Sequence, residues 1–313
     1  MDTEGMRRRQ DRLRRIEGLD PEADHREISS LFYLDFGTIM ILQAITGNLM
    51  TFAVPRMSRI LSATGQFERH TAKRFVDTAL LTGAVLEHGL QPGPGRDAAR
   101  AVNAMHRHYD IHPDDFTAVA CDAPVMSIDI ADRFGWRPVT DAEREALRIH
   151  YTAEARAFGA HRPVPATVGE MVAFRDRYLD AQAAFEPQNK RLAEAFLGYV
   201  AGLFPRPARP AVTALLVAQV DPRVLRACGL PVPSRVRKRV SDAVLRAVGL
   251  AGPTADPVPG KPSGMDRLAS PVYPHGWTIG DLGPRTASGD GSVLPVRPGE
   301  DGGDRDQGEP EER

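Results

Sequence analysis

The sequence has few of the features that mark disulfide-rich, zinc-dependent or nucleotide-dependent proteins. Its 313 residues include two cysteines, Cys121 and Cys228, which cannot form a disulfide framework and belong to no C-x-x-C pair. A reducing cytoplasm fits this cysteine usage best. The motifs H-E-x-x-H, G-x-S-x-G, G-x-G-x-x-G and G-x-x-x-x-G-K are also absent. Zinc proteases, serine hydrolases and nucleotide-binding folds therefore have no support.

A strong net charge is missing as well. The chain has 40 basic and 41 acidic residues, a formal charge of -1 and a pI near 6.8. This balance attracts neither nucleic acid nor anionic lipid as a whole, and we expect no nucleic-acid partner. One local basic cluster, Arg235, Arg237, Lys238 and Arg239, opens an expected helix. A solvated helix face is the favoured interpretation of this cluster, and peripheral membrane contact stays open beside it.

No uninterrupted hydrophobic run is long enough for a clear membrane span. The most apolar stretch, Leu31 to Val54, contains Asp35, Gln43 and Asn48, and a central carboxylate is costly in a bilayer. We expect one buried core helix or two short ones there. The basic start of the chain is followed by an acidic segment with no small-residue cleavage site nearby, so we expect no signal peptide.

Helical periodicity dominates the remaining sequence, which predicts an all-α protein. Proline and glycine separate the expected helices, and Thr140 and Thr167 begin two of them in the capping-box pattern. We expect one catalytic domain over residues 27–284, a lead-in over 1–26 and a disordered acidic tail over 285–313. The expected helices are Glu68–Glu87, Asp97–Tyr109, Thr140–Gly159, Thr167–Ala184, Lys190–Leu203, Ala211–Val220 and Ser234–Val248.

Histidine is the most informative residue type, because a neutral imidazole binds iron or zinc. His106 shares one face of its expected helix with Ala99, Val102 and Tyr109, which predicts that its ring points inward. His108 lies about 160 degrees around the same helix, so only one of the two can enter a given pocket. Taken alone, such a histidine is more often a hydrogen-bonded core residue than a ligand.

A second group of polar residues lies on the preceding helix. Arg74 and Thr78 are four residues apart and share a face, while Asp77 is three residues from Arg74. The plain interpretation is an exposed ion pair between Arg74 and Asp77, which contributes at most about 0.5 kcal/mol.

The order of these features resembles the MpaB-like oxygenase superfamily, which includes the latex-clearing rubber oxygenases, over most of residues 10–284. The element Arg74-Phe-Val-Asp-Thr78 is similar to the R-x-x-x-T element beside the haem in that family, and the helix with His106 is similar to its proximal-histidine helix. The order and spacing of the pieces carry the resemblance. The further pieces are Leu19-Asp-Pro-Glu22, Phe134-Gly-Trp-Arg-Pro138, Val164-Pro-Ala-Thr167, Tyr273-Pro-His-Gly-Trp277 and Asp281-Leu-Gly-Pro284.

The resemblance implies a globin-like helical core that holds haem b, with His106 as the axial iron ligand and His108 as second choice. Arg74 and Thr78 are implied to lie near the haem and to place it or the oxygen. The implied reaction is oxygenation of a hydrophobic alkene with O2. Asp77 departs from the rubber oxygenases, which resemble this element but carry lysine there, and it would reverse the local charge. A non-catalytic haem-binding or redox-sensing protein and a helical interaction protein with a vestigial site are the alternatives.

Overall fold

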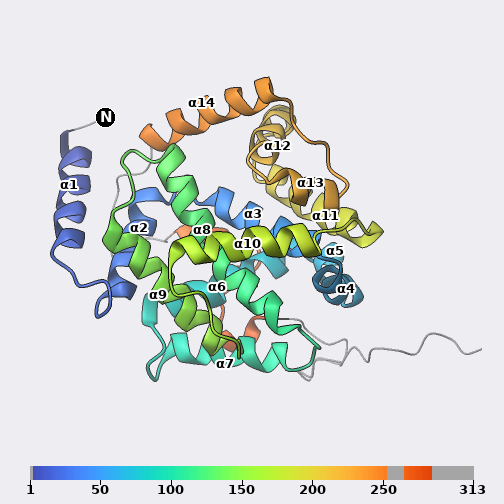
Figure 1. Ribbon diagram of the computed structural model, residues 1–313, viewed down its shortest axis with the longest axis horizontal. Coiled ribbons are helices and arrows are strands. Elements are labelled where there is room, and N and C mark those ends of the chain that lie inside the picture. The colour runs from blue at the N-terminus through green and yellow to red at the C-terminus, as the bar shows by residue number, and fades with distance from the viewer. Residues whose placement is uncertain (1–2, 252–263, 284–313) are drawn as a thin grey trace, which may run out of the picture.

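The computed structural model describes residues 3–251 and 264–283, and within these ranges all regular structure is helical (Figure 1). The helices are α1 (Thr3–Glu17), α2 (His25–Phe36), α3 (Ile41–Ala53), α4 (Pro55–Ala63), α5 (Gln66–Arg69), α6 (Thr71–His88), α7 (Pro94–His106), α8 (Pro113–Phe134), α9 (Asp141–Ala157), α10 (Val168–Gln182), α11 (Pro187–Gly202), η1 (Arg206–Ala208), α12 (Arg209–Val217), α13 (Pro222–Ala227), α14 (Arg235–Ala251), α15 (Gly264–Ala269) and η2 (Ile279–Asp281). The prediction of an all-α protein is confirmed. The tail expected over 285–313 lies outside the described residues.

The expected helices are present with shifted ends, except that Glu68–Glu87 is divided at His70 into α5 and α6. Both capping boxes form. Thr140 Oγ1 accepts a hydrogen bond from the Glu143 amide, and Thr167 Oγ1 accepts one from the Glu170 amide. One expected end is wrong in a way that matters for the site. Helix α7 ends at His106 rather than at Tyr109.

The apolar stretch over residues 31–54 forms two short helices, α2 and α3, bent by 107° at their break. Among the described residues no single helix is long and apolar enough to cross a membrane, and this bent pair passes only by length and composition. Phe32 and Leu42 are fully buried. Asp35 is buried too, and it pairs with Arg12 at 2.5 Å and with Arg137 at 2.8 Å. Salt bridges therefore explain how a carboxylate fits within this apolar segment.

Helix α8 is the centre of the molecule, with α3, α9, α10 and α14 packed around it (Figure 1). The largest apolar cluster surrounds this helix. A second cluster joins α6 and α7 to the C-terminal segment, residues 264–283. The lead-in is also part of the body, since Ile16 of α1 is fully buried against Ile28 and Ala146.

Candidate functional site

Helices α6 and α7 form an antiparallel hairpin whose closed end is apolar. Its turn requires glycine: Gly89 has a φ of 71°, and a Cβ on Gly95 would lie 2.1 Å from the Gly89 carbonyl oxygen. The helices therefore meet closely at this end. Small and branched side chains fill the contact, namely Leu81, Ala84, Ala98 and Ala99.

The open end of the hairpin carries His106, the last residue of α7. Its half-buried ring stands edge-on to Phe116, with ring centroids 5.4 Å apart. Its Nδ1 atom lies 2.9 Å from the carbonyl oxygen of Phe158, which directly follows α9. Because a carbonyl oxygen can only accept, Nδ1 donates, and the neutral ring keeps its lone pair at Nε2.

The surroundings of His106 favour its neutral form. Burial lowers the pKa of His106, the positive charge of Arg74 lowers it further, and the bond to Phe158 acts in the opposite direction. Nε2 has no hydrogen-bond partner in the part of the chain that the structure describes. A neutral imidazole whose other nitrogen donates to a backbone carbonyl is the usual state of a metal-ligating histidine.

His108 lies beyond the end of α7, in a turn closed by the bond from the Tyr109 amide to the His106 carbonyl, 3.0 Å long. Its side chain is exposed. The sequence predicted that His106 and His108 lie on opposite sides of one helix. The helix ends before His108, so this argument does not hold. His108 remains separated from the site because its turn faces solvent.

Arg74 and Thr78 lie together on α6, as their spacing predicts. Arg74 Nη1 donates to Thr78 Oγ1 at 2.8 Å, and Thr78 Oγ1 donates to the Arg74 carbonyl at 3.0 Å. Burial lowers the pKa of Arg74, which the charges of Asp77 and Tyr109 oppose. The positive charge of Arg74 is close enough to lower the pKa of His106, so the two predicted groups lie near each other.

The prediction of an exposed ion pair between Arg74 and Asp77 is wrong. The Asp77 side chain is 1% exposed, and its carboxylate pairs with Lys73 at 2.5 Å. It also accepts hydrogen bonds from the Gly283 amide at 2.9 Å and from the Tyr273 hydroxyl. Asp77 thus fixes the C-terminal segment to α6, and Lys73 neutralises the charge that was expected to reverse the field of the site.

Several residues that contribute to the site were not identified from the sequence. Phe158 acts through its backbone carbonyl, which every residue has, and only the packing of α9 brings it to His106. Phe116 contacts the imidazole from the start of α8. Lys73 is the one that a helix argument would have found, since it lies four residues before Asp77.

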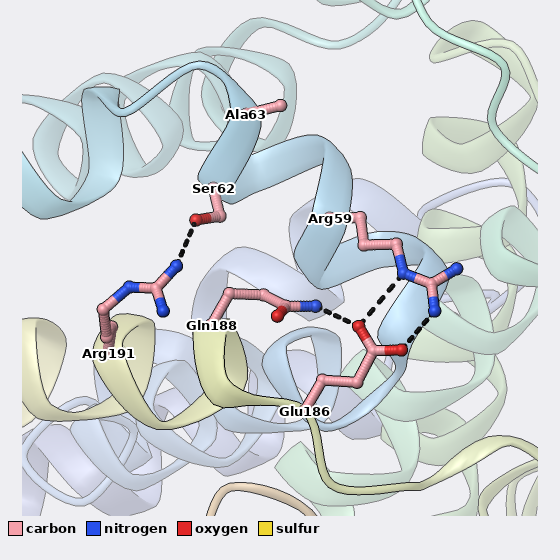
Figure 2. A pocket seen from close by; sticks show the side chains of 6 residues that line it. All are labelled: Arg59, Ser62, Ala63, Glu186, Gln188 and Arg191. Atoms are coloured by element: carbon pink, nitrogen blue, oxygen red, sulfur yellow. Dashed lines mark hydrogen bonds and ion pairs between the residues drawn. The ribbon is translucent and has the colours of Figure 1, made fainter. Parts of the chain in front are cut away.

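Two surface hollows lie elsewhere. One, of about 280 Å³, lies between α4 and the start of α11. Figure 2 shows that its polar side chains bond to one another, as when Glu186 accepts from Arg59 and Gln188. The other, of about 390 Å³, is mainly apolar and is formed by α11, α12 and the segment that enters α14. Neither hollow is lined by Arg74, Thr78 or His106.

Comparison with known families places these residues in context. The model of the family described as the ER-bound oxygenase mpaB/B'/rubber oxygenase catalytic domain matches residues 32–250, a range that includes α6, α7 and the Phe158 carbonyl. The chain belongs to this family. The resemblance inferred from the sequence is confirmed.

One curated relative and one solved structure show how far the similarity reaches. The "ER-bound oxygenase mpaB" of Penicillium roqueforti is 27% identical over 115 residues, which are 35% of this chain and 39% of that protein. The chain thus matches less than half of the length of this relative. The structure of latex clearing protein LCP in the closed state is 20% identical in sequence and has a TM-score of 0.59. The match covers 82% of this chain and 74% of the latex clearing protein chain. This likeness shows a shared fold.

The residues at the open end of the hairpin fit a haem group. Haem iron receives its in-plane ligands from the porphyrin and needs one axial atom from the protein. His106 Nε2 has the right tautomer for that role, and Arg74 is a half-buried cation suited to a carboxylate such as a propionate. Among the described residues no cluster of three His, Cys, Asp or Glu side chains could hold a metal ion alone.

Proposed function

We propose that the chain is a haem-b-dependent oxygenase that oxidises a hydrophobic, isoprenoid or lipid-like alkene with O2, and that His106 is the axial iron ligand. The observation that carries this proposal is the bond from His106 Nδ1 to the Phe158 carbonyl, which leaves Nε2 free. Membership of an oxygenase family supports the reaction class. The substrate class rests on the resemblance alone.

Each residue of the site has a task that follows from its contacts. When bound, haem b supplies the iron at which O2 is activated. The Phe158 carbonyl fixes the tautomer and orientation of His106. Arg74 would donate charge-assisted hydrogen bonds to a propionate or to an oxygen atom, and Thr78 holds the guanidinium in place.

The axial ligand is tested by the Soret band of the purified protein after reconstitution with haemin. His106→Ala should abolish the band, whereas His108→Ala should keep it, because His108 is exposed beyond the helix end. Circular dichroism must show that His106→Ala is folded, and added imidazole should then partly restore haem binding. Loss of haem in His108→Ala with retention in His106→Ala would overturn the assignment.

Catalysis is tested separately from haem binding. An oxygen electrode should record uptake when the haem-loaded protein meets squalene, a polyunsaturated isoprenoid, and none with its saturated analogue squalane. Haem binding without uptake would favour the non-catalytic haem-binding or redox-sensing alternative. Absence of any Soret band would favour the interaction protein with a vestigial site. The pairing of Asp77 with Lys73 weakens the argument from Asp77 for the non-catalytic alternative.

A further inference from the structure

Helix α14 (Arg235–Ala251) lies along the outer edge of the molecule (Figure 1). Several of its apolar side chains are exposed to solvent. Val236 is 71% exposed, Val240 59%, Val244 42% and Leu250 52%. Isolated exposed apolar side chains are ordinary, but a run of them along one helix marks a binding surface.

The packing of α14 shows that this face points directly away from the body. Leu245 is buried, and a Cβ on Gly249 would lie 1.8 Å from the Phe134 carbonyl oxygen, so these residues define the inner face. At about 100 degrees per residue, the face opposite to them is apolar without interruption. It consists of Val236, Val240, Ala243, Val244, Ala247, Leu250 and Ala251, all of them exposed.

Basic residues border the apolar face on both sides. By the same helical spacing, Arg235, Arg239 and Arg246 follow one border and Arg237 follows the other. The only acidic residue of the helix is Asp242, which pairs with Lys238 at 3.1 Å and Arg133 at 3.2 Å near the inner face. The outer surface of α14 is therefore apolar in the middle and positive at its edges.

The position of these charges is unfavourable for the helix itself. Arg235, Arg237, Lys238 and Arg239 all lie in the first turns, where the partial charge of the helix N-terminus is also positive. An external anion near this end would relieve the repulsion. This arrangement is the one expected of a helix that meets an anionic surface.

We propose that α14 is a membrane-docking helix that lies in the plane of an anionic lipid surface. The valines and Leu250 enter the boundary between headgroups and acyl chains, and the flanking arginines contact lipid phosphates. The surface continues past Arg237 into the apolar hollow of about 390 Å³, whose walls include Leu197, Val217 and Leu230. The inference does not depend on the proposed oxygenase function.

Charge also argues against a second copy of this chain as the occupant. In a symmetric dimer the same patch meets itself, so arginines from the borders of both copies would come close to each other. The one acidic residue of α14, Asp242, already pairs with Lys238 and Arg133. Such like-charge contacts oppose association. An anionic lipid surface complements both the apolar stripe and its borders.

The test is flotation of the full-length protein with vesicles of phosphatidylcholine and phosphatidylserine in equal parts, compared with phosphatidylcholine alone. Wild-type protein should bind the mixed vesicles and lose binding in high salt. Val236→Asp with Val240→Asp should lower the partition coefficient by roughly 10- to 100-fold, because two exposed apolar anchors are lost. Arg235→Gln with Arg239→Gln should lower it by roughly 10- to 30-fold.

Val172→Asp on α10 is the matched control, since Val172 is 39% exposed and lies outside α14, and it should bind like wild type. All substituted residues are exposed, and circular dichroism checks that the variants fold. Equal binding of wild type and the Val236/Val240 variant, or no binding to mixed vesicles, would overturn the proposal. Light scattering that shows a dimer lost in the same variant, without vesicle binding, would assign the face to a second copy.

Discussion

The two ends of the hairpin formed by α6 and α7 differ in what they contribute. At the closed end, Leu81 packs on small residues and Gly95 allows the backbones to touch. At the open end, Arg74, Thr78 and His106 are polar and only partly covered, and two of them already bond to each other. The comparison shows that the close packing at the closed end stabilises the hairpin, whereas the polar groups at the open end are placed to contact a ligand.

The largest expected loss of stability comes from a substitution at the closed end. Leu81→Ala should lower the free energy of unfolding by about 2–4 kcal/mol, because Leu81 is 2% exposed and its removal leaves a cavity. Urea unfolding followed by circular dichroism measures the change. Thr78→Ala at the open end is the matched control and should cost less than about 0.5 kcal/mol. Similar losses in both variants would contradict the division between the two ends.

A smaller effect is expected where the C-terminal segment covers the hairpin. Asp77→Ala should lower the free energy of unfolding by about 1–3 kcal/mol, because it removes the buried partner of Lys73. The loss stays moderate because the Lys73 ammonium group can still reach water. The segment should also loosen, which the fluorescence of Trp277 reports once Trp136 is replaced by phenylalanine. Asp97→Ala, which removes an exposed contact with Arg100, is the control. Unchanged Trp277 emission in Asp77→Ala would show that Asp77 does not hold the segment.

Protonation of a buried histidine outside the hairpin, His150, should cost stability in acid, which sets the background for any acid effect at the open end. Burial lowers the pKa of His150 to about 4, and the nearby Glu154 has its pKa raised by burial to about 8, so both are neutral at pH 7. Since the unfolded chain binds the His150 proton more readily, the contribution of His150 to stability is lost as pH falls from about 6.5 to about 4, by roughly 1–2 kcal/mol. Glu154 acts in the opposite direction, because its raised pKa makes the folded chain bind a proton more readily as pH falls from about 8 to about 4.5, so the two effects offset each other over most of this range. His150→Gln removes only the first contribution, so the stability of wild type relative to this variant, measured by urea unfolding, should fall by that amount between about pH 6.5 and about pH 4. A slope as steep as that of wild type would place the acid sensitivity elsewhere.

The smallest effect concerns the open end itself. Arg74→Ala should speed haem loss to apomyoglobin by roughly 10-fold, because a charge-assisted hydrogen bond is removed. Arg69→Ala provides the control, since Arg69 is exposed and, within residues 3–251 and 264–283, its guanidinium donates to the Thr64 carbonyl alone, at 3.1 Å. If both variants lost haem at the same rate, Arg74 would have no special place beside the cofactor.

Helix α8 shows why part of the fold could not be predicted from the sequence. It is the longest helix described, yet it contains Pro124 and is buried on several faces, so its residues show no clear division into apolar and polar faces. The amphipathic helices around it were predicted because each has one face in water. The end of α7 at His106 was missed by three residues, since no proline or glycine follows to mark it.

The sequence by itself determined the all-α fold, the placement of Arg74 and Thr78 on one helix face, and the choice of His106 as the inward histidine. These follow from the period of the helix, which is a local property of the chain. Only the tertiary structure decided that the Phe158 carbonyl orients His106, that Asp77 binds Lys73 and the C-terminal segment, and that α14 turns an apolar face outward. Each of these depends on which helices pack together, because backbone carbonyls and buried ion pairs acquire their partners only when distant segments meet.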